Sequence, residues 1–395
     1  MRQNNNKKKV LLAASVASMI DLFNRENIRI LQESGCQVEV EANFCFGNIT
    51  DAQRVEQFRL QLQQMGVAVW HIPIPRKAAD LTNILRSYQM LKKLCKKKDY
   101  DLIHTQSPIG GAVVRLAAAP YRNKGCRVIY TAHGFHFYKG ASVFRWLCCY
   151  PVEKLLSFCT DTLITINAED YRLAKSFRAR QVCYIPGIGI SLAEYGRDRT
   201  TRQKMRQEFG FRERDFVVLS VGQLSRRKNQ EVVIRALARL AKDKNNVQYV
   251  LAGLGEREAR YRRLARKLGV AHRVHVTGYR SDIPDLLQMA DCFAFPSRQE
   301  GLPVALMEAM AAGVAVVCSR IRGNCDLVRD GIEGRLVEPG DDAGFADAIR
   351  QVMEHQELAD IYRDNARKRV EKFSCQRVNR KMKQIYGQYL SGKSH

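Results

Sequence analysis

Short apolar runs separated by segments of helical periodicity recur along the whole chain, and this alternation restricts the folds open to it. In the first half the runs are residues 10–14, 38–42, 67–72, 102–105, 128–132, 162–166 and 182–185. In the second half they are residues 216–221, 248–252, 274–277, 292–295, 315–318 and 335–337. Successive parallel strands need a crossover connection, usually a helix. The pattern therefore predicts an α/β fold of doubly wound parallel sheets with helices on both faces.

The chain is long enough for two such sheets. Its 395 residues, 46% of them hydrophobic, are more than one core usually holds and provide two domains of roughly 200 residues each. The Pro-Gly-Ile-Gly-Ile segment at 186–190 interrupts the strand pattern and is the expected hinge. We predict a first domain over residues 1–188, a second over 189–374, and a closing segment over 375–395.

The start of the chain has two interpretations. Lys7, Lys8 and Lys9 precede the apolar run VLLAASVASMI, which mimics a signal peptide. The amphipathic segment from Leu22 to Gly35 and the strand-like QVEVEANF after it favour a strand, a loop, a helix and a strand. No other segment approaches the ~18 uncharged apolar residues of a membrane span, so none is expected.

The charge of the chain is strongly one-sided. Lys and Arg number 65 against 40 Asp and Glu, which gives a formal net charge of +25, spread over both halves. Such a surplus attracts phosphates in nucleic acid, in anionic lipid headgroups or in diphosphate substrates. No aromatic-basic recognition motif or helix-turn-helix spacing accompanies the charge, so nucleic acid is not the expected partner.

The cysteines and histidines show no metal-site pattern. Twelve cysteines are scattered without a Cys-x-x-Cys pair, and the eight histidines show no paired metal motif. This spacing predicts buried free thiols in a reducing cytosol rather than a disulfide framework.

The most specific motif is FPSRQEGLPVALMEAMAAGVAVVC at residues 295–318, which places Glu300 and Glu308 eight positions apart. Pro303 is expected to open a helix that ends before Gly313, so Glu300 lies in the loop ahead of the helix and Glu308 within it. The free amides at the helix start suit a diphosphate, and the two carboxylates can accept hydrogen bonds from sugar or ribose hydroxyls.

With this motif the chain resembles the family 4 glycosyltransferases, and the resemblance spans nearly all of it. It implies the GT-B fold, two Rossmann-like domains facing across a cleft, and transfer of a sugar from a nucleotide diphosphate with retention of configuration. By this resemblance Glu308 holds the ribose, Glu300 the transferred sugar, and the backbone at Gly301, Leu302 and Val304 the diphosphate. The last helix of the family crosses back to brace the first domain.

A basic loop, VGQLSRRKN, follows the first strand of the second half. Gly222 allows a close approach of the backbone to a ligand, and Arg226, Arg227 and Lys228 place cations where an open α/β sheet binds phosphates. The family shows Gly-Arg-x-x-x-x-Lys here, so Lys228 matches the lysine that grips the donor. Gln223 stands at the arginine position, which leaves Arg226 or Arg227 to replace it.

Two further glycine loops follow strands, at residues 251–256 and 276–282. In the family the loop equivalent to Gly278, Tyr279 and Arg280 holds the nucleobase through backbone atoms.

The first domain contributes two histidines at strand ends. His133, in YTAHGFHFYKG, lies at the carboxyl end of a strand and is followed by a glycine. The resemblance implies that this residue faces the donor sugar, so the expected catalytic set is His133, Lys228 and Glu300. His104, in DLIHTQSP, ends the preceding strand and is assigned to the acceptor side, with a purely structural role as the alternative.

Two segments predict contact with a membrane surface. The run LKKLCKKK at residues 91–98 is basic, and the segment from Phe135 to Phe158 mixes aromatic with cationic residues. The alternatives are a solvated helix end for the first segment and buried helix packing for most of the second. We expect a peripheral enzyme at the cytoplasmic face of the cell membrane.

The predicted function is a retaining glycosyltransferase that uses a UDP-linked sugar and a lipid-diphosphate-linked saccharide acceptor, as in bacterial capsule and exopolysaccharide synthesis. No metal or other cofactor is expected, because the cationic side chains of the basic loop can neutralise the donor diphosphate. The alternatives are a UDP-sugar 2-epimerase of the same fold, a nucleic-acid-binding protein and a catalytically silent scaffold.

Overall fold

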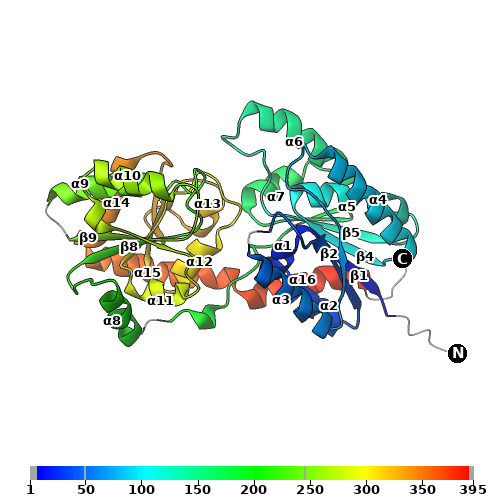
Figure 1. Ribbon diagram of the computed structural model, residues 1–395, viewed down its shortest axis with the longest axis horizontal. Coiled ribbons are helices and arrows are strands. Elements are labelled where there is room, and N and C mark those ends of the chain that lie inside the picture. The colour runs from blue at the N-terminus through cyan, green and yellow to red at the C-terminus, as the bar shows by residue number, and fades with distance from the viewer. Residues whose placement is uncertain (1–6, 49, 197, 244–245, 391–395) are drawn as a thin grey trace. The chain divides into compact units, whose positions relative to one another are not determined.

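The computed structural model describes residues 7–48, 50–196, 198–243 and 246–390. The chain forms two compact units, residues 1–188 together with 376–395, and residues 189–375. Each unit is a parallel sheet with helices packed on its two faces (Figure 1). The first division falls at the predicted position, and the second falls one residue beyond the predicted start of the closing segment.

The first unit contains seven strands in the order β3-β2-β1-β4-β5-β6-β7, each parallel to its neighbours. The strands are β1 (Lys9–Val16), β2 (Gln37–Asn43), β3 (Ala68–His71), β4 (Leu102–Gln106), β5 (Arg127–Ala132), β6 (Thr162–Thr165) and β7 (Gln181–Tyr184). The helices are α1 (Ala17–Phe23), α2 (Arg25–Glu33), α3 (Ala52–Gln64), α4 (Leu81–Lys98), α5 (Pro108–Arg122), α6 (Val143–Leu156), α7 (Ala168–Ala174) and α16 (Cys375–Leu390). The strand order reverses between β1 and β4, which is where open α/β sheets bind ligands.

The second unit contains six parallel strands in the order β10-β9-β8-β11-β12-β13. The strands are β8 (Phe216–Val221), β9 (Val247–Ala252), β10 (Val274–Gly278), β11 (Cys292–Phe295), β12 (Ala315–Ser319) and β13 (Gly334–Val337). The helices are α8 (Arg199–Glu208), α9 (Glu231–Leu240), α10 (Glu258–Lys267), α11 (Ile283–Met289), α12 (Val304–Ala311), α13 (Asn324–Leu327), α14 (Asp342–Glu354) and α15 (Gln356–Val370). Its order reverses between β8 and β11, so the loops after these two strands flank the expected ligand site.

All thirteen predicted strands are present, with ends within two residues of the prediction. Five 3₁₀ turns complete the secondary structure: η1 (Ser157–Cys159), η2 (Leu192–Glu194), η3 (Ala241–Asp243), η4 (Ala271–Arg273) and η5 (Glu371–Phe373). The predicted α/β class with two Rossmann-like sheets is confirmed. The apolar start of the chain, which resembled a signal peptide, forms strand β1, which pairs with β2 and β4, and the beginning of α1.

Alternation along β1 builds two cores in the first unit. Val10 and Leu12 point into the core shared with α2, α3 and α16, whereas Leu11 and Ala13 point into the core shared with α4 and α5. The helices lie on opposite sides of the sheet in Figure 1. Because strand side chains alternate between faces, an apolar strand buried on both sides needs no polar positions.

Helix α16 packs on the first unit. Its buried face consists of Val378, Met382, Ile385 and Tyr386, at the spacing of one helical stripe. The Tyr386 hydroxyl lies 2.7 Å from His104 Nδ1. The end of the chain is therefore fixed to the sheet by both apolar packing and a buried polar contact.

One buried acid in the first sheet lacks partners. Glu41 on β2 has no exposed surface, and neither carboxylate oxygen has a hydrogen-bond partner among the described residues. Burial raises the pKa of Glu41 well above its usual value, because the charged form is disfavoured without water or a counterion. Burial therefore favours the protonated, neutral form of this side chain in the folded state.

This proton uptake makes stability depend on pH. A group whose folded pKa is raised stabilises the fold below its unfolded pKa, near 4.5, and loses this contribution as the pH rises toward the folded pKa. We expect Glu41→Gln to be near neutral at pH 4.5 and to stabilise the first unit increasingly above it, by about 1.4 kcal/mol per pH unit. Urea unfolding followed by tryptophan fluorescence measures this directly, because both tryptophans, Trp70 and Trp146, belong to the first unit. A stability difference that stays constant from pH 4.5 to 7 would contradict the assignment.

Candidate functional site

Two charged loops meet at the C-terminal edge of the second sheet. The loop after β8 carries Arg227 and Lys228, and the loop after β11 carries Glu300. Lys228 Nζ and Arg227 Nη1 each lie 2.9 Å from Glu300 Oε1. Arg227 also donates to the carbonyl oxygen of Gln299, at 3.0 Å. We call Arg227, Lys228 and Glu300 the cation–carboxylate cluster.

The ammonium group of Lys228 is held by its surroundings as well as by its ion pair. Gly222 has a φ of 139°, and a Cβ at this position would lie 3.3 Å from Lys228 Cε. On another side, Lys228 Nζ lies 4.6 Å from the centroid of the Phe295 ring, within the range of a cation–π contact. Because Gly222 has no side chain, it leaves room for the side chain of Lys228.

The cluster shifts the pKa values of its members. Burial lowers the pKa of Lys228, although the negative charge of Glu300 acts against this. For Glu300, burial alone would raise the pKa, but the charges of Lys228 and Arg227 outweigh it and hold the pKa below its usual value. Glu300 is thus a carboxylate whose charge depends on two neighbouring cations.

The second acid of the motif has a different partner. Glu308, on α12, accepts a hydrogen bond of 3.0 Å at Oε1 from the hydroxyl of Tyr195. Burial raises the pKa of Glu308, and the hydrogen bond from Tyr195 reduces the shift. Tyr195 follows η2 in the segment that precedes the second sheet, and the sequence analysis missed it, because nothing in the local pattern distinguishes it from other loop tyrosines.

The start of α12 presents backbone amides beside the cluster. The helix begins at Val304, with Pro303 as its N-cap rather than its first residue, one position later than predicted. Amides in the first turn of a helix have no intrahelical acceptor. The Gly301 carbonyl is packed so closely against Gly323 that a Cβ at Gly323 would collide with it. Gly301, Leu302 and Val304 thus lie on a loop whose path is fixed.

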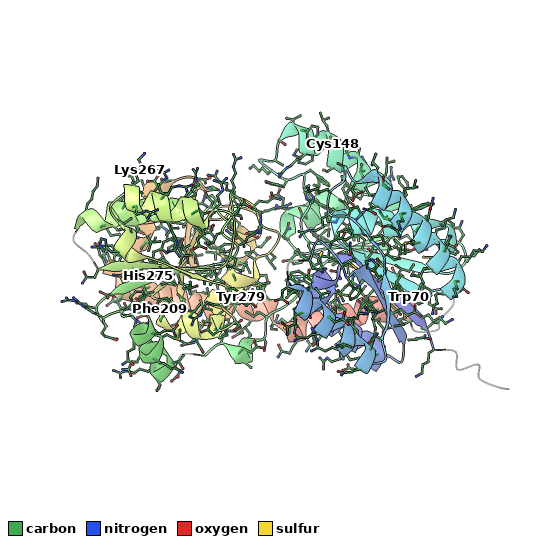
Figure 2. The ribbon with its side chains drawn as sticks, in the orientation of Figure 1. Trp70, Cys148, Phe209, Lys267, His275 and Tyr279 are labelled. Carbon is green, nitrogen blue, oxygen red and sulfur yellow. The ribbon has the colours of Figure 1, made fainter. Side chains whose placement is uncertain are left out.

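The three residues predicted at the end of β10 and in the loop after it, Gly278, Tyr279 and Arg280, have different surroundings. Gly278 has a left-handed φ of 72°, and its carbonyl accepts a 2.7 Å hydrogen bond from the amide of Gly253, which ties two glycine loops together. Tyr279 is 75% exposed and is labelled in Figure 2. Arg280 forms ion pairs with Asp282 at 2.5 Å and Glu208 at 2.7 Å. Its side chain therefore braces the loop against α8.

The structure separates the two arginines that were candidates for the position of Gln223. Arg227 contacts Glu300, whereas Arg226 lines a different cavity together with Arg257 and Arg298. Of the two, only Arg227 lies with Lys228 in the cation–carboxylate cluster.

In the first unit His133 follows β5 and faces a small pocket of about 40 Å³. Its Nε2 donates to Gln106 Oε1 at 2.5 Å, and Gln106 in turn donates to Asn24 Oδ1. The ring lies 5.6 Å from that of Phe23. Burial lowers the pKa of His133 to about 4, so the imidazole is neutral at pH 7.

His104 does not occupy the acceptor-side position assigned to it. It is 1% exposed, and its Nε2 lies 2.8 Å from Thr131 Oγ1 while its Nδ1 contacts Tyr386. Burial lowers its pKa to about 3. Because both ring nitrogens are engaged inside the core, His104 holds α16 to the sheet, which was the structural alternative.

The described residues also include the cysteines and other side chains that could bind a metal ion. Within residues 7–48, 50–196, 198–243 and 246–390, no group of three or more His, Cys, Asp or Glu side chains is arranged to hold a metal ion. All twelve cysteines are free thiols. The expectation that they are buried is wrong for Cys45, Cys148 and Cys325, which are exposed.

Comparison with known families agrees with this geometry. The family model described as "Glycosyl transferases group 1" matches residues 201–369, and that described as "Glycosyl transferase 4-like domain" matches residues 23–187. EpsD of Bacillus subtilis (strain 168), which is named as a glycosyltransferase, is 37% identical over 386 residues, covering 97% of each chain. The chain therefore belongs to this glycosyltransferase family, and the resemblance recognised from the sequence is confirmed.

More distant relatives extend the comparison. The UDP-Gal:α-D-GlcNAc-diphosphoundecaprenol α-1,3-galactosyltransferase of Escherichia coli is 28% identical, covering 81% of this chain and 84% of its own. The crystal structure of Anabaena HepE in complex with UDP and glucose aligns with a TM-score of 0.76 at 22% identity, covering 96% of this chain and 100% of HepE. The protein is a GT-B glycosyltransferase close to bacterial exopolysaccharide and capsule enzymes.

The cation–carboxylate cluster can be tested without an activity assay. Lys228→Ala should lower the unfolding temperature of the second unit by several degrees, because the nearly buried Glu300 loses its best counterion. The loss of stability should be largest at pH 7. It should shrink as the pH falls below about 4.5, because protonation of Glu300 removes the negative charge that Lys228 compensates. In the Lys228→Ala/Glu300→Gln double variant part of the loss should be recovered, with a coupling of roughly 1–3 kcal/mol in scanning calorimetry. Additive effects would show that the two side chains do not stabilise each other.

Proposed function

We propose that the protein is a retaining glycosyltransferase that moves a sugar from a UDP-linked donor to a lipid-diphosphate-linked saccharide during the synthesis of a bacterial surface polysaccharide. The observation that carries the proposal is the convergence of two cations, two acids and a helix start at the C-terminal edge of the second sheet. The printed names of the relatives support it: the Escherichia coli enzyme takes UDP-Gal and a diphosphoundecaprenol-linked sugar, and HepE was crystallised with UDP and glucose.

The diphosphate is the best match for the cations of the cluster. Lys228 and Arg227 would bind its oxygens, and the amides at Leu302 and Val304 would add hydrogen bonds from the start of α12. Negative charge develops on the leaving diphosphate in the transition state, so these groups stabilise the transition state more than the bound donor. This arrangement supplies the positive charge without a metal ion, and we propose that no metal is required.

The two acids would bind the remaining parts of the donor, which are the ribose and the transferred sugar. Glu308, oriented by Tyr195, would accept hydrogen bonds from the ribose, and Glu300 would accept them from the transferred sugar. His133, neutral at pH 7, would face the donor sugar as an uncharged hydrogen-bonding group. In a retaining transfer the acceptor hydroxyl attacks the face that the diphosphate leaves.

Donor screening with each nucleotide sugar and a diphosphoundecaprenol-linked acceptor, read by mass spectrometry, tests the function and its metal independence. We expect an acceptor product that is still formed with excess EDTA. Lys228→Ala should reduce transfer at least ~100-fold, the loss expected for one charge-stabilising group. Conversion of a UDP-sugar without any acceptor would instead indicate the epimerase, and loss of activity in EDTA restored by Mg²⁺ or Mn²⁺ would contradict metal independence.

The same variants separate the roles of the acids. In calorimetry with UDP, Glu308→Gln should weaken nucleotide binding, while Glu300→Gln should leave it unchanged and still reduce transfer. Equal losses of UDP affinity in both variants would show that the roles are divided wrongly.

We further propose that the enzyme attaches peripherally to the cytoplasmic face of the membrane through α6. Among the described residues no helix is both long enough and apolar enough to cross a bilayer. The outward face of α6 and the residues after it is apolar, with side chains between half and three-quarters exposed: Val143, Phe144, Leu147, Val152, Leu155 and Phe158. Cys148, labelled in Figure 2, is exposed on the same helix. The helix also carries Arg145 and Lys154, so it combines apolar and cationic groups as interfacial helices do.

This surface differs from the one expected from the sequence. Phe135 and Phe137 are buried, stacked 4.8 Å apart in the core beneath α6, so they cannot touch a membrane. Of the five lysines on α4, Lys98 pairs with Glu39 at 3.2 Å and lies over Trp70, whereas Lys92, Lys93, Lys96 and Lys97 are exposed.

Vesicle sedimentation tests the membrane proposal. The protein should bind vesicles that contain phosphatidylglycerol and be released as salt rises past physiological strength. Replacing Phe144, Leu147 and Leu155 by Ser should weaken binding at least tenfold, because each loses roughly 1 kcal/mol or more of apolar burial. Changing Lys92, Lys93, Lys96 and Lys97 to Gln should remove most of the salt sensitivity. Wild-type protein that ignores these vesicles at low salt, or α6 variants that bind them equally well, would refute the proposal.

A further inference from the structure

A second charged cavity lies in the same unit as the cation–carboxylate cluster. It has a volume of about 350 Å³ and is lined by four arginines, Arg226, Arg257, Arg260 and Arg298. These residues come from three separate loops or helices: the loop after β8, the first turn of α10 with its N-cap, and the loop after β11. We call it the arginine cavity.

Positive charge in the arginine cavity is poorly compensated. Glu231, the only acid in its lining, is paired with Arg260 at 2.9 Å. The guanidinium groups of Arg226, Arg257 and Arg298 form no ion pair or hydrogen bond with any residue the structure describes. Other arginines of this unit do have acidic partners, for example Arg202 and Arg206, which pair with Asp291. Three unpaired guanidinium groups around one cavity repel one another unless an anion joins them.

The floor of the cavity is rigidly built. Asn229 is buried in a left-handed conformation, with a φ of 59°, and its amide donates to the carbonyl oxygens of Pro296 at 3.1 Å and Pro339 at 2.6 Å. The hydroxyl of Tyr261, also buried, lies 3.1 Å from both the Ser225 carbonyl oxygen and Gln230 Oε1, within hydrogen-bonding distance of the two acceptors. These contacts fix the loops that carry the arginines, so little order is lost when a ligand binds.

The arginine cavity and the cation–carboxylate cluster draw on the same two loops but on different residues. After β8, Arg226 lines the cavity while Arg227 and Lys228 contact Glu300. After β11, Arg298 lines the cavity while Glu300 belongs to the cluster. Neither Lys228 nor Glu300 lines the cavity. The two sites are therefore neighbours that share loops but no residue.

We propose that the arginine cavity binds a compact anion that carries two or more phosphate groups. Guanidinium groups form paired, charge-assisted hydrogen bonds with phosphate oxygens, and three of them exceed the need of a single monoanion. The N-termini of α9 and α10, which are the positive ends of the helix dipoles, both lie at the cavity. Glu231 begins α9, Arg257 is the N-cap of α10, and both residues line the cavity. A volume of about 350 Å³ accommodates more than one phosphate group. The anion is either a free oligophosphate or the headgroup of a phospholipid.

Calorimetric titration with inorganic tripolyphosphate tests this site. To exclude binding at the cation–carboxylate cluster, the titration is done with the full-length Lys228→Ala variant as well as with the wild type. We expect one equivalent to bind to the Lys228→Ala variant and at least one to the wild type. Arg226→Gln, Arg257→Gln and Arg298→Gln should each weaken this binding about tenfold or more, the usual effect of losing one charged hydrogen-bonding group. The arginines lie at the surface, so these variants should keep the unfolding temperature of the wild type.

Arg263→Gln is the matched control, because Arg263 is exposed on α10 but does not line the cavity. It should bind tripolyphosphate like the wild type. Equal weakening in the control, binding that vanishes with Lys228→Ala, or no binding to the wild type at low salt would overturn the proposal. Failure of the glycosyltransferase assay would leave the result unaffected, since no donor sugar is used.

A second arm distinguishes the source of the phosphate. Vesicles of phosphatidylcholine with cardiolipin, which carries two phosphates, are compared with free tripolyphosphate as a competitor. A lipid headgroup ligand predicts that Arg226→Gln and Arg298→Gln reduce vesicle binding and that tripolyphosphate displaces the wild type. A free oligophosphate ligand predicts that both variants bind vesicles normally. Either result supports the site and names its source.

Discussion

A parallel strand requires a crossover before the chain can return, so every strand in a unit ends at the same edge of its sheet. In the second unit this brings the loops after β8, β9, β10 and β11 together although they are distant in sequence. The strand order reverses between β8 and β11, so the loops after these two strands lie beside each other. Glu300 meets Lys228 because of this reversal. The same constraint gathers His133 and Gln106 at the edge of the first sheet.

The surplus positive charge does not form a single surface with a single function. Several arginines serve buried acids: Asp161 is contacted by Arg122, Arg127 and Arg180, and Arg115 pairs with Glu153 inside the first unit. Removing one partner of such a pair leaves an unpaired buried charge, so these contacts fix strands and helices in place. The net charge of +25 therefore overstates the charge available to ligands. An anionic ligand is favoured where several cations without acidic partners lie together, as they do in the arginine cavity.

The backbone of the protein was predictable because its strands are continuous apolar runs, buried on both faces, bounded by glycine loops. The roles of side chains were predictable only where the strand topology fixed the position of the side chain. Lys228 and Glu300 each follow a strand directly, so topology places them together. Tyr195 belongs to the segment before the second sheet, and its contact with Glu308 depends on how that segment folds back, which no periodicity records. His104 lies within β4, whereas His133 follows β5, and α16 arrives from the other end of the sequence and contacts His104 through Tyr386.

The choice between Arg226 and Arg227 illustrates the same limit at the level of one residue. The two are adjacent in sequence and chemically identical, and neither composition nor spacing separates them. In the loop after β8 they diverge: Arg227 reaches Glu300 and the Gln299 carbonyl, whereas Arg226 turns to the arginine cavity. The left-handed backbone of Asn229, fixed by two carbonyl oxygens of neighbouring loops, ends the segment and sets this alternation. An anion held by Arg226 and Arg298 would restrain both loops that carry the cation–carboxylate cluster.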